Sequence, residues 1–407
     1  MRCIPLALGI VVVLTFPVVA RGQSATAPRP LRVVLYPFIP EYPTVQAELR
    51  SGFEALHPDI SLTFIDLTSN YYDATKANYI GSTSADVYEL DSVFLKEFVK
   101  KQKIRPWPAN VLLPEDRLVR NAAAGSKMGG VRYGAAHWLC GNFIFFKKTD
   151  VAVVGVKRLS DLEKAIGGSD HPQGRGLAAD LKGKSTLGEF YLETAFDHYG
   201  DWPKAHEHLK SMDPVLEHDI VRLIDLCDPG MCRNTDYHNN DPDIYGRLFA
   251  DQKARVLLGY SEGLHPVLVE GAQCKQKTGC LTDSDIDVVG FPSDDNGRHQ
   301  MSWVDSYVLD RGCDPQRTRD AATFVGYMQS DQVYKMILLH SGVAPAYLLP
   351  AKAALYQDQE VVRVAHLYPQ LKSLIEDAEV PSDVGLNDEL RGKGAQLDRE
   401  LSCNPAQ

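Results

Sequence analysis

The feature that most constrains the fold of this chain is a strand–helix–strand pattern near its beginning. Residues 31–36 are a short β-branched run, residues 44–56 place apolar side chains on one helical stripe, and residues 60–65 alternate apolar with polar. Pro58 stops the helix just before the second strand. Two strands joined by a helix at this spacing form a βαβ unit, so the sequence predicts an α/β fold with a mostly parallel sheet.

The alternation of strands and helices continues along the chain, with no internal repeat or low-complexity tract. Later strands are expected at residues 84–91, 141–146, 254–260, 285–291 and 302–309. Later helices are expected at residues 92–101, 159–166, 188–199, 245–252, 315–330 and 361–375. About 385 residues follow an N-terminal leader, which is more than one core normally holds, so two domains are expected.

The leader, residues 1–22, has the pattern of a secretory signal peptide. Arg2 supplies a positive charge, residues 4–19 are largely apolar, and Ala20-Arg21-Gly22 resembles a small-residue cleavage site. The apolar run is shorter than a membrane span, and no other stretch approaches 18 apolar residues. We therefore expect a soluble protein without a membrane span that is secreted or periplasmic.

The chain is acidic, with 43 Lys and Arg residues against 53 Asp and Glu residues and a net charge of -10. Loss of Arg2 and Arg21 with the leader leaves 41 basic residues against 53 acidic ones, a net charge of -12. This balance argues against binding of nucleic acid or an anionic membrane surface, and it is compatible with a cationic ligand.

Seven cysteines remain after the leader, and six of them form candidate disulfide pairs. The candidate bridges are Cys227–Cys232, Cys274–Cys280 and Cys313–Cys403. Six cysteines allow fifteen connectivities, so the pairing stays open. A zinc site at the first two pairs is an alternative, but their spacings exceed the usual C-x2-C and an oxidising compartment favours disulfides. Any even pairing of the six leaves Cys140 as a free thiol.

The order of motifs resembles that of type II periplasmic solute-binding proteins. The resemblance covers nearly all of residues 31–350 and rests on five segments. They are Phe-Glu-Ala-Leu-His-Pro-Asp-Ile-Ser-Leu-Thr-Phe at 53–64, Ala-Asp-Val-Tyr at 85–88, Phe-Ala-Asp-Gln-Lys-Ala at 249–254, Val-Gly-Phe-Pro at 289–292 and the helix that ends at Asp331. It implies a two-lobe α/β fold with a central ligand cleft between lobes joined by crossing strands.

This resemblance also implies where the lobes divide. Lobe 1 is expected at residues 31–136 plus about 293–345, and lobe 2 at residues 140–290 plus about 346–407. The crossings would fall near residues 134–141 and 288–303, which places Cys140 at a hinge that faces the cleft.

Within that superfamily the chain resembles one group of enzymes, the type I thiaminases (thiamine pyridinylases). Trp-Leu-Cys-Gly-Asn-Phe at 138–143 is similar to their nucleophile strand, and Gly-Tyr-Ser-Glu-Gly at 259–263 to the segment with their catalytic glutamate. Leu-Tyr-Pro-Phe-Ile-Pro at 35–40 and Trp-Val-Asp-Ser at 303–306 are similar to their aromatic and acidic binding segments.

The resemblance implies that Cys140 adds covalently to the pyrimidine of thiamine and lets the thiazole depart. A thiolate is a suitable soft nucleophile at neutral pH if a neighbouring group takes the thiol proton. The resemblance assigns this role to Glu262, which would then act as acid and base for an incoming amine or thiol. No cofactor and no metal are implied.

Alternative interpretations remain for both residues. A single cysteine among aromatic residues is often a buried, inert thiol, and Glu262 by itself is an exposed strand-end glutamate. His137 is another possible base, although strand residues three apart point to opposite faces of the sheet.

Two acidic residues at strand ends, Asp86 and Asp305, are candidates for the ligand cleft, because ligands of open α/β sheets bind at strand ends. Either carboxylate could hold the substrate's amino group or offset the thiazolium charge, or instead cap a helix. Asp91 is better explained as the cap of the following helix.

Aromatic side chains complete the expected site, because aromatic faces attract a cationic heterocycle and stack on a pyrimidine. The tyrosines that fit the family's habit of lining the cleft are Tyr36, Tyr72, Tyr245 and Tyr260, and Trp303 adds an aromatic face beside Asp305. Phe38 departs from the family pattern, since a second tyrosine is expected there, and the missing hydroxyl leaves one expected hydrogen bond open.

The sequence therefore predicts an exported thiaminase that acts on thiamine and a small amine or thiol co-substrate, and we expect a monomer. The alternative is a non-enzymatic extracytoplasmic solute-binding protein for thiamine or a related heterocycle. A cysteine hydrolase on this scaffold has no motif of its own.

Overall fold

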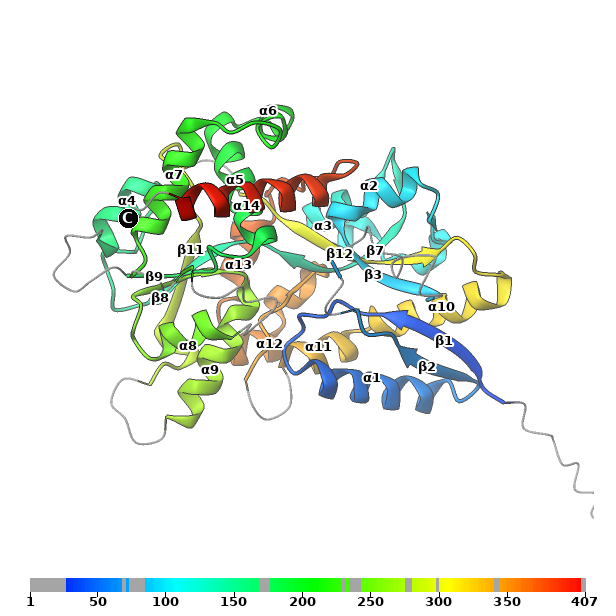
Figure 1. Ribbon diagram of the computed structural model, residues 1–407. Helices are drawn as coiled ribbons and strands as arrows, with labels where there is room; N and C mark the ends of the chain where they lie inside the picture. The colour runs from blue at the N-terminus through cyan, green and yellow to red at the C-terminus, as the bar shows by residue number, and fades with distance from the viewer. Residues whose placement is uncertain are drawn as a thin grey trace, which may run out of the picture.

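The structure is a computed structural model in which two α/β lobes lie side by side (Figure 1). It describes residues 27–67, 71–72, 85–167, 176–228, 232–233, 243–274, 280–297, 300–339 and 344–403. The expected leader, residues 1–22, lies outside the described residues. No helix among the described residues is long and apolar enough to span a membrane.

Lobe 1 is built on a seven-stranded sheet with the order β13-β7-β12-β3-β1-β2, to which β4 adds beside β12. The predicted βαβ unit is confirmed, because β1 pairs in parallel with both β2 and β3, whereas β12 runs antiparallel to β3 and β7. The strands are β1 (Arg29–Val34), β2 (Ile60–Phe64), β3 (Val87–Asp91), β4 (Ile104–Arg105), β7 (Gly134–Cys140), β12 (Trp303–Asp310) and β13 (Leu349–Pro350).

Helices cover both faces of this sheet (Figure 1). On one side lie α1 (Tyr42–Leu56) and α10 (Pro315–Met328), and on the other α2 (Ser92–Lys100) and α3 (Arg120–Gly125). Helix α11 (Asp331–Leu339) follows α10, and the hairpin of β5 (Lys127–Met128) and β6 (Val131–Arg132) follows α3. The buried stripe of α1 consists of Val45, Leu49 and Phe53, as its helical spacing predicts.

Lobe 2 has a four-stranded sheet with the order β11-β8-β10-β9. Its strands are β8 (Phe143–Lys147), β9 (Leu177–Ala178), β10 (Val256–Gly259) and β11 (Ile286–Gly290). Its helices are α4 (Leu159–Ile166), α5 (Lys184–Tyr199), α6 (Trp202–Glu207), α7 (Pro214–Asp225), α8 (Ile244–Ala250), α9 (Leu264–Gln273) and α14 (Leu386–Cys403). Helices α12 (Gln359–Val364) and α13 (Tyr368–Ile375) and short 3-10 turns occupy the remaining connections.

The chain crosses between the lobes where β7 passes into β8 and where β11 leads to β12. Gly141 lies at the first crossing, and a Cβ there would stand 3.3 Å from the carbonyl oxygen of Met301 in the second crossing. A side chain would crowd Met301 and also Ile375, whose Cδ1 would lie 3.0 Å from the Cβ, so glycine suits the close approach of the two crossings.

The lobe boundaries differ from the expected ones at two places. All of β7, through Cys140, belongs to the sheet of lobe 1, and β13 at residues 349–350 returns to that sheet by pairing with β7. Sequence periodicity locates strands, but it does not show which sheet a two-residue strand will join.

The cysteines follow the expected pairing in two of three cases. The disulfides Cys227–Cys232 and Cys274–Cys280 are present, which confirms those two predictions. The predicted bridge between Cys313 and Cys403 is wrong, because Cys313 is a free thiol, as Cys140 is. Its sulfur lies 3.6 Å from the carbonyl oxygen of Asp86 in lobe 1, whereas the C-terminal helix α14 packs against α5 of lobe 2.

The packing of α14 on α5 depends on glycine at the helix contact. A Cβ at Gly394 of α14 would overlap the backbone carbonyl of Lys184 in α5, and one at Gly188 would overlap the carbonyl of Leu390. Gly392, also in α14, has no atom within 4 Å of the position that a Cβ would take.

These two glycines of α14 provide a matched test of the packing. We expect Gly394→Ala to destabilise the protein by about 1–3 kcal/mol, because the helices must move apart. Gly392→Ala should be neutral or stabilising by roughly 0.5–1 kcal/mol, because alanine is the better helix former. Urea unfolding of both variants measures the difference, and equal stabilities would contradict the assigned contact.

Candidate active site

The free thiol of Cys140 lies at the end of β7, where the chain leaves lobe 1 for lobe 2. It is 6% exposed, and its Sγ donates a hydrogen bond of 3.5 Å to Oδ2 of Asp305. Burial raises the pKa of the Cys140 thiol well above its ordinary value, and the charges of Asp305, Glu262 and Asp91 raise it further. In the free protein the sulfur therefore holds its proton, and a base or an incoming cation is needed to form the thiolate.

Asp305 and Asp91 are a pair of acidic residues beside the thiol, which we call the acidic floor. They are directly opposite each other in the antiparallel pair of β12 and β3. Burial and the charges of Asp91 and Glu89 raise the pKa of Asp305 well above its ordinary value, and burial raises the pKa of Asp91 to about 6. Two adjacent buried carboxyls do not both ionise readily, so this floor attracts a proton or an external cation.

Asp91 has a second role besides the helix cap that the sequence predicts. Its Oδ1 accepts from the backbone N–H of Val93 at 2.9 Å, which caps α2. Its Oδ2 accepts from the hydroxyl of Tyr72 at 3.3 Å, so the same carboxylate also belongs to the acidic floor. From the sequence, Asp91 is better explained as a helix cap than as a ligand contact, and its bond to Tyr72 is the part that the sequence does not predict.

Glu262 comes from lobe 2, in the turn η3 (Ser261–Gly263) that directly follows β10. Burial raises its pKa to about 7, and the hydroxyl of Tyr36 in lobe 1 donates to its Oε1 at 3.4 Å. Its charge acts on Cys140 across the lobe boundary. A carboxyl with a pKa near neutrality both takes and returns protons, which is the property of a general base.

Aromatic rings enclose this cluster on the side of lobe 1. The Tyr36 ring lies edge-on to Phe38 and Tyr71, with ring centroids 5.5 and 5.9 Å apart, and Phe38 stacks on Tyr72 at 6.2 Å. Tyr71 also donates to Oδ1 of Asp305 at 3.1 Å. The sequence predicts Tyr72 but not Tyr71, although both take part in this cluster.

Lobe 2 contributes two further carboxyls that the sequence analysis missed, Glu189 and Glu193 on α5. Burial raises the pKa of each to about 8. The hydroxyl of Tyr260 donates to Oε2 of Glu189, and the amide of Asn142 donates to Oε1 of Glu193 at 2.8 Å. Two glutamates four residues apart on one face of the predicted helix are the available signal.

Of the remaining predicted residues, Trp303 lies next to Cys140 and Asp86 does not. Asp86 precedes β3 at the end opposite Asp91, where it accepts from the backbone N–H of Arg32 at 2.9 Å and pairs with Arg317 at 3.4 Å. The structure therefore does not bring Asp86 together with Cys140. Trp303 lies directly opposite Cys140 in the sheet and is buried.

His137, considered from the sequence as an alternative base, lies in the core of lobe 1. Its Nδ1 is 2.5 Å from Oε1 of Glu89 and 2.9 Å from the hydroxyl of Tyr307. These two partners occupy Nδ1 of the imidazole, and the hydrogen bond of the Cys140 thiol goes to Asp305 rather than to His137.

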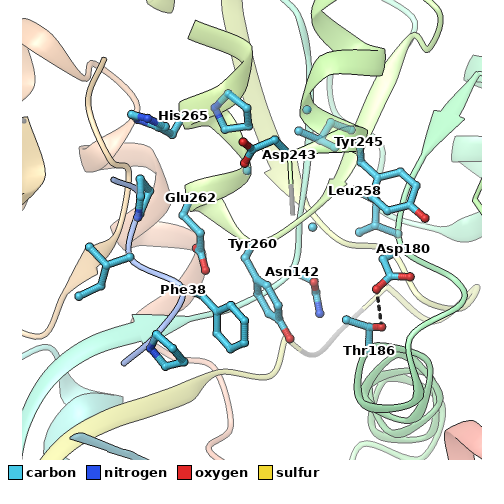
Figure 2. Close-up of a pocket in the computed structure, with 18 of the residues that line it drawn as sticks. Phe38, Asn142, Asp180, Thr186, Asp243, Tyr245, Leu258, Tyr260, Glu262 and His265 are labelled. Atoms are coloured by element: carbon cyan, nitrogen blue, oxygen red, sulfur yellow. Dashed lines mark hydrogen bonds between the residues drawn. The ribbon is translucent and has the colours of Figure 1, made fainter. Parts of the chain in front are cut away.

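A cavity of about 400 Å³ opens beside Glu262. Its walls come from the segment after β1, from Asn142 in the first crossing, and from α8, β10 and α9 of lobe 2. Figure 2 shows Glu262, Phe38 and Tyr260 around the same space, with Tyr245 on the lobe 2 side. Predicted residues Tyr245, Tyr260 and Glu262 thus line the cavity. Among the residues that the structure describes, no group of three or more His, Cys, Asp or Glu side chains is placed to hold a metal ion.

Comparisons with known proteins identify relatives over nearly the whole chain. Residues 141–276 match the Thiaminase-1 domain. Thiaminase-1 of Paenibacillus thiaminolyticus is 28% identical over 409 residues, which cover 94% of this chain and 95% of that protein.

Solved structures agree in fold. The structure of Clostridium botulinum thiaminase I in complex with thiamin has a TM-score of 0.75 at 18% identity and covers 91% of this chain and 100% of that one. The GacH receptor of Streptomyces glaucescens GLA.O has a TM-score of 0.69 at 16% identity and covers 93% and 94% of the two chains. The predicted two-lobe solute-binding-protein fold is confirmed.

The raised pKa of Glu193 predicts how the stability of the protein depends on pH. Between its ordinary value of 4.5 and about 8, the folded protein keeps a proton that the unfolded chain loses, so this carboxyl lowers stability as pH rises. Glu193→Gln keeps an acceptor for Asn142 and removes the titration.

We expect the melting temperature of Glu193→Gln to exceed that of the parent protein by at least about 2 °C at pH 9, with a smaller difference at pH 6. Thermal unfolding followed by circular dichroism over pH 5–9 measures this gap. The exposed Glu207→Gln is the control, and a gap independent of pH would count against a buried, protonated Glu193.

Proposed function

Because this chain is a thiaminase I homologue, with the Thiaminase-1 domain on a solute-binding-protein fold, we propose that it displaces the thiazole of thiamine and transfers the pyrimidine to an amine or thiol. The observation that carries this proposal is the pairing of a buried, acid-surrounded thiol in lobe 1 with a carboxyl of pKa about 7 in lobe 2.

The first half of the reaction begins with Glu262 as the base. Glu262 takes the thiol proton, and the Cys140 thiolate adds to a ring carbon of the pyrimidine. The electron pair that this addition places in the ring then forms a double bond to the methylene carbon, and the bond between that carbon and the thiazolium nitrogen breaks. Its electron pair stays on the nitrogen, so the thiazole leaves as a neutral ring.

The second half transfers the pyrimidine. The lone pair of the acceptor forms a bond to the methylene carbon, the ring electrons return, and the bond between carbon and the Cys140 sulfur breaks. Over one turnover, Glu262 takes the proton of Cys140 and returns it, and it passes the proton of a primary amine or thiol acceptor to solvent.

The acidic surroundings of Cys140 suit a cationic substrate and no other charge type. In the free protein, the carboxyls of Asp91, Asp305 and Glu262 disfavour a thiolate. A bound thiazolium cation offsets these negative charges, so substrate binding itself lowers the pKa of the thiol. The thiol would therefore be activated chiefly when thiamine is in place.

The binding roles follow from the positions of the side chains. We assign the aminopyrimidine to the floor of Asp305 and Asp91, whose carboxyls can hold its amino group. Tyr36 and Tyr72 supply aromatic faces for the pyrimidine and the cationic ring. Tyr260, Tyr245 and Trp303 support the site from the cavity wall and from the sheet beside Cys140.

A solute-binding protein without enzymatic activity would need the cleft and the aromatic rings, but neither the thiol nor a carboxyl of pKa about 7 beside it. The combination of Cys140 with Glu262 therefore favours the enzyme.

We also propose that the protein is secreted or periplasmic and acts as a monomer. Two disulfides suit an oxidising compartment. Cys140 and Glu262 come from the two lobes of one chain, so the site needs no second copy.

Replacement of the nucleophile tests the covalent step. Cys140→Ser should lower the rate of product formation by on the order of 10³-fold or more, because an alcohol at neutral pH is a far weaker nucleophile than a thiolate. Chromatography of a mixture with thiamine and aniline measures the substituted pyrimidine. Cys313→Ser removes the other free thiol among the described residues and should remain active, and full activity of Cys140→Ser would reject the mechanism.

The pKa of Glu262 sets the acid side of the pH profile. A base must be ionised in the free enzyme, so kcat/KM for thiamine should rise with pH and level off above about 7. Glu262→Gln should reduce kcat/KM by roughly 10²–10⁴-fold and remove this limb. An unchanged acid limb in the Gln variant would show that another group is the base.

A further inference from the structure

We propose that the cavity beside Glu262 is the acceptor site, and that it selects neutral or cationic amines over anionic nucleophiles. This inference rests on the proposed function, and it names the class of co-substrate. The co-substrate must reach the carbon from which the thiazole has departed, so its site must adjoin both the nucleophile and the base.

The cavity meets this requirement through residues shared with the catalytic cluster. Glu262 lines its wall, and its charge acts on Cys140. Asn142 lines it as well, two residues after Cys140 at the first crossing. Neither Cys140 nor Asp305 lines it, so we place the pyrimidine on the Cys140 side and the acceptor within the cavity.

The leaving ring and the acceptor must use this space in turn, because both form their bond to the same methylene carbon. The neutral thiazole leaves with the electron pair of the broken bond. The acceptor then donates its own pair to that carbon and releases Cys140. A primary amine transfers its proton to Glu262 in this step, so the acceptor nitrogen must approach that carboxyl.

The size and the walls of the cavity suit an aromatic or small aliphatic amine. Its volume of about 400 Å³ lies within the range of small-molecule sites. Apolar and aromatic side chains form much of its wall, among them Phe38, Tyr42, Phe190 and Leu258. A single substituted ring could pack between these side chains and point its nucleophilic atom at Glu262.

The charges of the cavity wall disfavour anionic acceptors. Four carboxyl residues line the cavity, Glu41, Asp180, Asp243 and Glu262. Among the described residues of its wall there is one histidine, His265, and no lysine or arginine. The positive end of helix α9 also reaches the cavity, but Glu262 directly precedes it and opposes its partial charge. A carboxylate or phosphate group on the acceptor would therefore meet a wall with more acidic than basic side chains.

A pair of acceptors with almost the same shape tests this selection. We expect kcat/KM for 3-aminobenzamide to exceed that for 3-aminobenzoate by on the order of tenfold or more at low salt, a difference that falls as salt screens the charge. The carboxylate withdraws less electron density from the ring than the amide does, so the amine of 3-aminobenzoate is the stronger nucleophile. Intrinsic reactivity therefore works against the expected result.

Variants of the wall locate the origin of the selection. Glu41 and Asp243 have side chains 47% and 53% exposed, so Glu41→Gln with Asp243→Asn should fold. We expect this double variant to reduce the preference for the neutral acceptor several-fold. Asp116→Asn with Glu207→Gln changes the net charge equally at exposed positions away from the cavity, and it should keep the preference.

The outcomes separate the inference from the function on which it rests. Formation of no substituted pyrimidine with either acceptor would overturn the proposed function. Equal kcat/KM for the two acceptors would overturn the selection while leaving the transfer reaction intact. A strong preference that the cavity variant and the control variant retain equally would place the acceptor outside this cavity.

Discussion

The structure depends on keeping several carboxyls and one thiol in a space that excludes most water. Burial is the first cause of the raised pKa at Cys140, Asp305, Glu189 and Glu262. In water these groups would titrate independently and near their ordinary values. In the low dielectric between the lobes, each negative charge makes the next one more costly, so the site holds protons at neutral pH and favours a cation. Nucleophile, base and substrate charge are linked through this one constraint.

Much of the fold could be predicted from the sequence because its strands and helices carry clear periodic patterns. The first βαβ unit, β8, β10, β11, β12 and α10 all lie at or within a few residues of their predicted positions. Helix α14 is not predicted from the sequence. It packs against α5, and every residue of α5 from Ser185 to Asp197 is buried. Glu189 and Glu193 receive their hydrogen bonds from Tyr260 and Asn142, and these contacts between distant segments do not show in the sequence pattern.

The candidate site shows the same division between local and tertiary information. Cys140 and Glu262 were identified by motifs of adjacent residues, which a single sequence preserves. The choice between Asp86 and Asp91 was different, because one strand has an acid at each end. Only the pairing of β12 with β3 and the packing of α10 in lobe 1 show that Asp91 faces Asp305 while Asp86 pairs with Arg317. The wrong prediction at Cys313 has a similar origin. Whether Cys313 can reach the C-terminus depends on where α14 packs, which the sequence does not show.

Cys140 ends a strand of lobe 1, whereas Glu262 follows a strand of lobe 2, and the hydroxyl of Tyr36 joins the two lobes at that carboxyl. The two-lobe scaffold therefore protects the thiol when no substrate is bound. Any opening of the cleft would draw the base away from the sulfur and leave a protonated thiol, which reacts slowly with oxidants and stray electrophiles. In an oxidising compartment, a protein with an unpaired cysteine benefits from such protection, and the reactive form would exist only while the lobes enclose a substrate.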